Sequence, residues 1–221
     1  MSFWFKNAVV DESDEERYWG RFAASYDEDG KHVVGQVLLD DVIQILSEEK
    51  HLGKTLEFGC GTGFFTIEIA KNAEHLIATD LSDEMVAVAK DRLKGLPNVS
   101  VKKASCYDDS FEAGSFDTIF MINLLHVIKN PERAIENGSR LLRKGGKLIA
   151  IDFTTYGVKL MDKLKMGWRY LSKWSLPPLG ASNQLTPKSF SQMVRNHGLE
   201  ISSVQILGNV AKALYLKAFK I

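Results

Sequence analysis

The segment that most constrains the fold of this chain runs from Thr55 to Thr66 and reads TLEFGCGTGFFT. An apolar run leads into Glu57 and three alternating glycines, and a second apolar run further along the chain ends in Asp80. Glycines let a backbone turn sharply and approach a ligand closely, and a carboxylate at the end of the second strand can accept hydrogen bonds from ribose hydroxyls. The stretch therefore predicts a βαβ unit that holds a nucleoside cofactor.

The composition predicts a packed α/β protein without a nucleic-acid partner. The 221-residue chain is 45% hydrophobic, and its 28 basic and 28 acidic residues balance, so its charge does not favour nucleic acid. Cys60 and Cys106 lack metal-ligand spacing, so no metal site is expected. With only two cysteines and no signal-peptide pattern or membrane-spanning stretch, we expect a cytoplasmic protein.

Apolar periodicity and turn residues predict seven strands that alternate with helices. The expected strands are residues 56–58, 76–79, 99–104, 116–122, 147–153, 201–207 and 211–219. The expected helices are residues 13–28 with Ser13 as N-cap, 35–49, 63–72, 82–94, 131–143 closed by Gly145 and Gly146, and one from Pro187 to about His197. This order predicts a Rossmann-like three-layer α/β sandwich whose mostly parallel sheet ends in an antiparallel hairpin.

The spacing of the glycines separates two classes of cofactor. Dinucleotide folds need G-x-G-x-x-G, in which the third glycine allows close packing beneath a pyrophosphate. Here the corresponding position is Phe64, which would obstruct a diphosphate, and Glu57 would place negative charge near the phosphates. Both features disfavour NAD and suit a ligand that has no phosphate and carries a positively charged amino group.

Four segments in order resemble the motifs of the class I S-adenosylmethionine (SAM)-dependent methyltransferases. They are EFGCGTG at 57–63, DLSDEM at 80–85, FEAGSFD at 111–117 and RLLRKGGKL at 140–148. The resemblance covers about residues 18–153 and the C-terminal hairpin. It is closest to the small-molecule branch that includes the ubiquinone and menaquinone biosynthesis methyltransferases. It implies methyl transfer from SAM to a small acceptor by direct in-line displacement, with S-adenosyl-L-homocysteine as product.

The resemblance also implies which residues bind the cofactor. The glycine loop would pass beneath the methionine part of SAM, with Glu57 near its ammonium and Asn123 bordering the same part. Asp80 would bind the ribose hydroxyls, and Met85 would lie against the adenine. The full implied set is Tyr18, Tyr26, Glu57, Gly59, Gly61, Thr62, Gly63, Asp80, Leu81, Met85, Ser105, Cys106 and Asn123. An ordinary tight turn and a solvated strand end are the simpler explanations of the glycines and of Asp80.

The chain departs from the family pattern at a position that is expected to bind the adenine. Many relatives carry an acidic residue after the third strand that accepts a hydrogen bond from the adenine amino group, whereas Ser105 stands there in this chain. A hydroxyl accepts that bond more weakly than a carboxylate does. Asp108 is an alternative acceptor, and Cys106 would lie beside the adenine through its backbone amide.

Two residues are candidate general bases. His126 follows the fourth strand, where the family often places residues that face the reaction centre, and Tyr156 follows the fifth. A structural role for His126 beneath the next helix is the simpler alternative. Cys60 is an improbable nucleophile, because SAM would occupy its loop and methyl transfer in this family is direct.

We expect a single domain, 1–221, with four parts. The N-terminal helices at 13–50, which include Tyr18 and Tyr26, would close over the SAM-binding core at 54–153, and the last helix and hairpin would occupy 186–221. The insertion at 156–185 carries apolar residues at helical spacing, namely Leu160, Met161, Leu164, Trp168 and Leu171.

This insertion is expected mainly to cap the pocket of a small, partly apolar substrate. A homodimer interface, or contact of residues 158–176 with a membrane surface, is less favoured. The chain is expected to be a monomer or a homodimer. Two other functions stay open, a non-catalytic protein that binds SAM or S-adenosylhomocysteine and, with less support, an NAD-dependent oxidoreductase.

Overall fold

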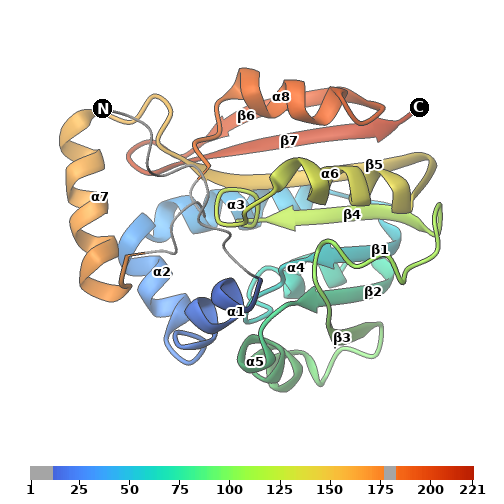
Figure 1. The fold of residues 1–221 in the computed structure, drawn as a ribbon, viewed down its shortest axis with the longest axis horizontal. Coiled ribbons are helices and arrows are strands. Elements are labelled where there is room, and N and C mark those ends of the chain that lie inside the picture. Colours follow the sequence, from blue (N-terminus) through green and yellow to red (C-terminus); the bar gives the residue numbers. More distant parts are fainter. Residues whose placement is uncertain (1–11, 177–182) are drawn as a thin grey trace.

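The computed structural model describes residues 12–176 and 183–221, which form a twisted sheet covered by helices on both faces (Figure 1). The helices are α1 (Glu12–Gly20), α2 (Tyr26–Val34), α3 (Gln36–Glu48), α4 (Thr66–Ala70), α5 (Asp83–Leu93), α6 (Pro131–Leu141), α7 (Leu160–Lys173) and α8 (Pro187–Arg195). The strands are β1 (Gly53–Phe58), β2 (Ala73–Asp80), β3 (Val99–Lys103), β4 (Phe116–Ile122), β5 (Leu142–Thr154), β6 (Leu199–Leu207) and β7 (Lys212–Lys220).

The sheet has the strand order β3-β2-β1-β4-β5-β7-β6. The first five strands of this order pair in parallel, and β7 pairs antiparallel with both β5 and β6. The predicted α/β sandwich with a C-terminal antiparallel hairpin is therefore confirmed. The order reverses between β1 and β4, and in such sheets ligands bind beyond the carboxyl ends of the strands at this point.

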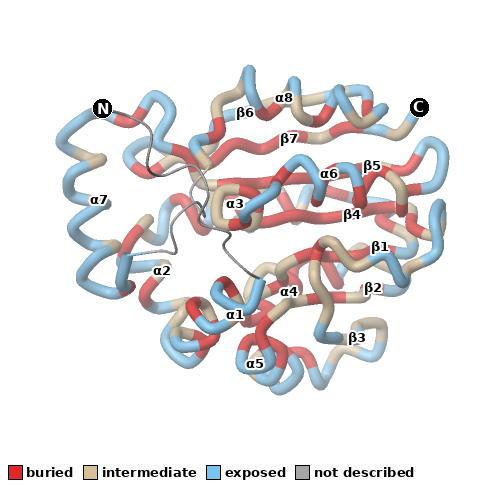
Figure 2. The backbone as a smooth tube through the Cα atoms, viewed as in Figure 1, coloured by how far each residue is buried: buried red, intermediate tan, exposed pale blue. Residues whose placement is uncertain are grey.

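Two large apolar clusters lie on opposite faces of the sheet. One joins α6 and α8 to the sheet through side chains such as Ile135 and Phe190, and the other joins α3 and α4 through Val42 and Ile69. The central strands are buried, whereas α7 is exposed over most of its length (Figure 2). The core thus fixes the carboxyl edge of the sheet, and α1, α2 and α7 lie beyond that edge, at the left in Figure 1.

Three predicted element boundaries were wrong. The helix expected at 13–28 is two helices that bend between Gly20 and Tyr26, and Ser13 lies inside the first of them and is not its N-cap. The bend lets Gly20 pack tightly on α5, since a Cβ atom there would lie 2.5 Å from Glu84 Oε2.

The glycine pair at 145 and 146 does not end α6, because β5 already begins at Leu142, which pairs with Phe116. The helix after the glycine loop is also shorter than the expected 63–72, with α4 limited to Thr66–Ala70. By contrast, α8 begins as expected, with Thr186 and Ser189 forming a reciprocal cap.

Candidate active site

A cleft opens at the carboxyl edge of the sheet, between the glycine loop and the helices α1 and α2. Most of the expected cofactor-binding residues line it, namely Tyr26, Glu57, Gly59, Gly61, Thr62, Asp80, Leu81, Met85, Ser105, Cys106 and Asn123. They come from the start of α2 and from the ends of β1, β2, β3 and β4 with the segments that follow these strands. The structure therefore gathers in one place residues that are up to about a hundred positions apart in the chain.

Asp80 holds the glycine loop in place. One carboxylate oxygen accepts the Gly61 N–H at 2.8 Å, and the other accepts the Ser82 N–H at 2.9 Å. Gly61 has a positive φ of 54°, and Gly63, with a φ of 79°, packs so closely on α5 that a Cβ atom would lie 2.9 Å from Leu93. Burial raises the pKa of Asp80, and the two backbone N–H groups oppose that shift.

Glu57 lies beneath this loop and is fully buried. It accepts a hydrogen bond from Thr66 Oγ1 at 2.7 Å, which links the end of β1 to the start of α4. Burial raises the pKa of Glu57 to about 7, and the nearby negative charge of Asp80 acts in the same direction. A bound cation would reverse part of this effect by favouring the ionised carboxylate.

Polar contacts hold α1 and α2 over the cleft. Asp27 of α2 accepts a hydrogen bond from Thr62 Oγ1 at 2.6 Å and forms an ion pair with Arg92 of α5. On α1, Glu15 accepts the Lys129 N–H at 3.0 Å, and its burial raises its pKa to about 7. The N-terminal helices are therefore bound to the glycine loop, to α5 and to the loop after β4.

The carboxylate of Glu12 in α1 lies beside Ser105, the position at which many relatives have an acidic residue. Ser105 Oγ donates a hydrogen bond to Glu12 at 2.6 Å, and both residues line the cleft. Asp108 instead accepts the Ser110 N–H at 2.8 Å and is not among the lining residues within the described chain. Sequence reasoning did not single out Glu12. The helical spacing of Glu12, Glu15 and Trp19 was the available signal, because all three line the cleft.

Aromatic rings form one wall of the cleft. Tyr26 stacks on Trp174 with a centroid distance of 5.6 Å and an interplanar angle of 23°, and Trp19 meets both rings edge-on. Trp174 belongs to the insertion after β5 and is 7% exposed. Among the described residues of the predicted substrate cap, Trp174 lines the cleft.

Two buried polar atoms at the cleft have no hydrogen-bond partner within the described chain. They are the Nε1–H donor of Trp174 and the Oδ1 acceptor of Asn123. Asn123 has a positive φ of 54°, and its N–H donates to Ile151 O at 2.7 Å, so its backbone is fixed while its side chain is unpaired. Buried polar groups in proteins are usually satisfied. A ligand that accepts a hydrogen bond from Trp174 and donates one to Asn123 would therefore satisfy both atoms.

Four of the expected site residues do not line the cleft within the described residues: Tyr18, Gly63, His126 and Tyr156. The Tyr18 hydroxyl is 2.9 Å from that of Tyr170 and donates to the carbonyl of Ser175, so it joins α1 to α7. Tyr156 is 45% exposed. Gly63 acts by packing on α5, as described above.

His126 is held by Asp152 rather than by a cleft residue. Its Nδ1 hydrogen-bonds the fully buried carboxylate of Asp152, which also accepts the Leu125 N–H at 2.7 Å. The His126 ring contacts Phe153 edge-on at 6.0 Å, and Phe153 lines the cleft. The imidazole is thus oriented by a carboxylate. It contacts a residue that lines the cleft but does not line the cleft itself.

Neither cysteine has the environment of a nucleophile. Both thiols are buried, and burial raises the pKa of Cys60 and of Cys106, so both stay protonated. Between residues 12–176 and 183–221, no three His, Cys, Asp or Glu side chains gather in a way that would hold a metal ion.

Comparison with known proteins agrees with this geometry. The sequence profile of a family described as "Methyltransferase domain" matches residues 56–150, which run from β1 into β5 and include the glycine loop and Asp80. The predicted resemblance to the class I SAM-dependent methyltransferases is therefore confirmed. The cofactor of this family is SAM, and the two unpaired atoms and the Asp80-bound loop fit it.

The individual relatives are only distantly similar to this chain. A ubiquinone/menaquinone biosynthesis C-methyltransferase of Rhizobium johnstonii is 28% identical over 59% of the chain and 54% of that protein. The chain spans about half the length of such curated relatives.

Solved structures share the fold at lower identity. A SAM-dependent methyltransferase of Thermotoga maritima, described as a possible histamine N-methyltransferase, has a TM-score of 0.71 at 19% identity and covers 93% of this chain and 99% of its own. The [4+2]-cyclase SpnF has a TM-score of 0.64 at 18% identity and covers 82% of this chain and 81% of its own. At these identities the likeness concerns the fold.

Proposed function

We propose that this protein transfers a methyl group from SAM to a small, partly apolar acceptor. The observation that supports this most is the pair of unpaired atoms, Trp174 Nε1 and Asn123 Oδ1, in a cleft whose glycine loop is bound by Asp80. The cleft also combines aromatic and carboxylate side chains, which suits a cofactor that carries positive charge. A cytoplasmic location fits this proposal.

Particular residues would hold the cofactor. Asp80 would accept hydrogen bonds from the ribose, and Asn123 Oδ1 and Glu57 would face the ammonium group. Met85 and Cys106 would border the adenine. We propose that the helices within 13–50 close over the core at 54–153, and their contacts with Thr62, Arg92 and Lys129 support this.

When bound, SAM supplies an electrophilic methyl group on a sulfonium and a leaving group that departs neutral. The protein therefore needs no group that stabilises a departing anion. Trp19, Tyr26 and Trp174 exclude water from the cleft, and holding the acceptor in line can contribute several kcal/mol. An acceptor that is protonated at neutral pH also needs a base, for which His126, oriented by Asp152, is our candidate.

Binding without methyl transfer is the main alternative, because a fold does not determine a reaction. SpnF, described as a [4+2]-cyclase, shares this fold. An NAD-dependent oxidoreductase is less compatible, because Phe64 lines the cleft where a dinucleotide fold would need a glycine.

Calorimetry and a transfer assay test the proposal. SAM and S-adenosylhomocysteine should bind, and NAD should not. Transfer of a labelled methyl group from SAM should be measured across a panel of phenols, amines, thiols and quinols. Binding of SAM with no product from any acceptor would favour the non-catalytic alternative, and a folded protein indifferent to SAM would contradict the proposal.

A further inference from the structure

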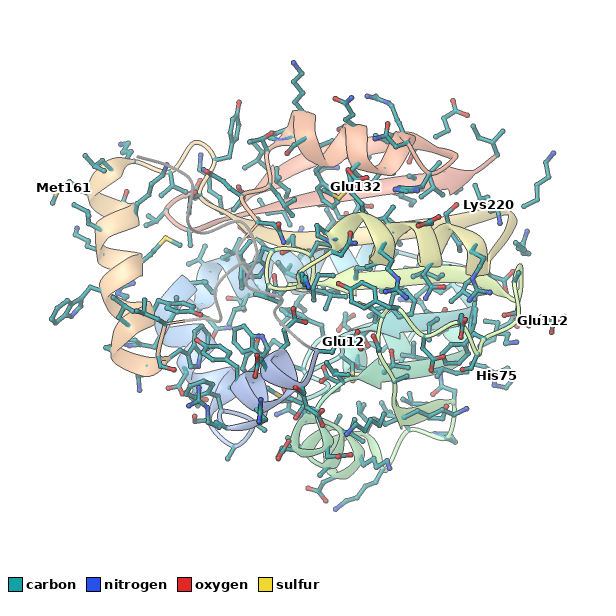
Figure 3. All side chains as sticks on the ribbon, viewed as in Figure 1. Glu12, His75, Glu112, Glu132, Met161 and Lys220 are labelled. Atoms are coloured by element: carbon teal, nitrogen blue, oxygen red, sulfur yellow. The ribbon has the colours of Figure 1, made fainter. Side chains whose placement is uncertain are left out.

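The helix α7 turns its more apolar face away from the protein. Leu160, Met161, Leu164, Trp168 and Leu171 recur at intervals that place them on one side of the helix, and each is between 55% and 78% exposed. We call these five residues the α7 stripe. Met161 points away from the rest of the molecule in Figure 3. The apolar face of a helix is normally buried against another element. This face is exposed, so it is available to contact another surface.

The opposite face of α7 already binds the protein. Met166 packs against the apolar cluster beneath α3, Tyr170 contacts Tyr18, and Lys173 forms an ion pair with Asp29 at 3.0 Å. These contacts attach the helix firmly to α1 and α2. Turning the stripe inward would break these contacts, so the stripe faces outward as a fixed feature.

Basic side chains border the stripe. By helical spacing, Lys163 lies on one side of it and Lys165 on the other. Arg169 lies further round the helix, where it lines a shallow hollow with residues of α2 such as Glu28. Lys159 precedes the helix, and Asp162 is the one acidic residue within α7. Within the described residues, none of these four cations forms an ion pair or a side-chain hydrogen bond. The outward face thus combines large apolar side chains with unpaired positive charge.

We propose that the α7 stripe docks on the surface of an anionic lipid bilayer. A helix with this pattern lies in the plane of a bilayer interface, with its apolar side chains among the acyl chains and its cations beside lipid phosphates. Long lysine side chains can reach the headgroups from the edges of the stripe. No helix among the described residues is long and apolar enough to cross a membrane, so the contact is a surface contact.

Pairing with a second copy explains the surface less well. In a two-fold interface the same patch meets itself, so Lys163 and Lys165 of both copies would be brought together without acidic partners. An anionic lipid surface complements this charge instead. Docking would also bring lipid close to the cleft, because α7 ends directly before Trp174, which lines it.

Sedimentation with lipid vesicles tests this proposal independently of catalysis. The protein should bind vesicles of phosphatidylcholine mixed with phosphatidylglycerol at least about tenfold more tightly than vesicles of phosphatidylcholine alone, and added salt should weaken the binding. Leu164→Glu and Trp168→Glu should each lower the affinity at least about tenfold, because they place a charge in the apolar contact. Lys163→Glu with Lys165→Glu should remove the preference for the anionic lipid.

Ile221→Glu is the matched control, because it also replaces an exposed apolar residue, at the opposite end of the molecule (Figure 1). It should bind vesicles as the unaltered protein does. Circular dichroism and SAM calorimetry on each variant show whether the fold and the proposed cofactor site are retained. Equal binding to both vesicle types, or none, overturns the proposal. So does a dimer in light scattering that Trp168→Glu converts to a monomer, because a second copy would then cover the stripe.

Discussion

Glu12, at the start of α1, accepts a hydrogen bond from Ser105, which follows β3, although the two residues are 93 positions apart. The family pattern places an acidic side chain at the position of Ser105, and here a carboxylate reaches the same place from the N-terminal helix. We propose that Glu12 supplies the negative charge that Ser105 lacks toward the adenine amino group.

Glu12→Gln tests this role. The amide can still accept a bond from Ser105, but it loses the charge-assisted bond to the adenine amino group, a difference of about 1 kcal/mol. The dissociation constant for SAM should rise about fivefold. The preference for S-adenosylhomocysteine over its inosine analogue, which lacks the amino group, should fall by a similar factor in calorimetry. Asp14→Asn, on the exposed side of the same helix, should change neither value. An unaltered preference in Glu12→Gln would contradict the role.

Asn123→Gly tests the role of the Asn123 side chain separately from that of the backbone conformation at the end of β4. Glycine adopts the positive φ of this residue without strain, so the fold should be retained while the unpaired Oδ1 is lost. SAM affinity should fall about tenfold, and the melting temperature should change little. Asn123→Ala should lose the same affinity and also about 1–2 kcal/mol of stability, because alanine is strained in the left-handed region. Equal SAM binding by all three proteins would show that Oδ1 does not contact the cofactor.

The buried Glu57 should make stability depend on pH. Its pKa is about 7 in the folded protein against an ordinary value of 4.5, so the folded state holds this proton more tightly than the unfolded chain does. The contribution of Glu57 to stability is therefore greatest below about pH 4.5 and is lost as the pH rises through about 7. At about 1.4 kcal/mol for each pKa unit, the loss is of the order of 3 kcal/mol.

Glu57→Gln should remove this part of the pH dependence, because its amide can still accept the bond from Thr66 and does not ionise. Chemical denaturation of both proteins at about pH 5 and about pH 8 measures the difference. Glu112→Gln, at the exposed edge labelled in Figure 3, is the control and should follow the unaltered protein. The same pH dependence in Glu57→Gln as in the unaltered protein would show that another group is responsible.

His126→Ala should lower kcat about a hundredfold or more if the acceptor must lose a proton, because Asp152 orients the imidazole for that step. The dissociation constant for SAM should stay within about twofold, since His126 does not line the cleft. Tyr156→Phe serves as the comparison and should keep near-normal turnover, because Tyr156 is half-exposed. Turnover by His126→Ala close to that of the unaltered protein would leave His126 with a structural role.

Local sequence features predicted most of the fold. The apolar runs at β1, β2 and β4, the start of α8 at Pro187 and the C-terminal hairpin each depend on neighbouring residues, and all were predicted from the sequence. The bend between α1 and α2 was missed because it depends on a close contact between Gly20 and Glu84 of a distant helix.

The features of the site likewise fall into those that the sequence predicted and those that only the tertiary structure revealed. The sequence by itself determined the glycine loop, Asp80 and the class of cofactor, because a turn and the strand end opposite it are encoded in one short βαβ unit. Only the tertiary structure decided that Glu12 reaches Ser105, that Asp152 orients His126 and that the α7 stripe faces outward. These relationships join residues that come together only when the sheet and its helices have packed, and no local pattern specifies such pairs.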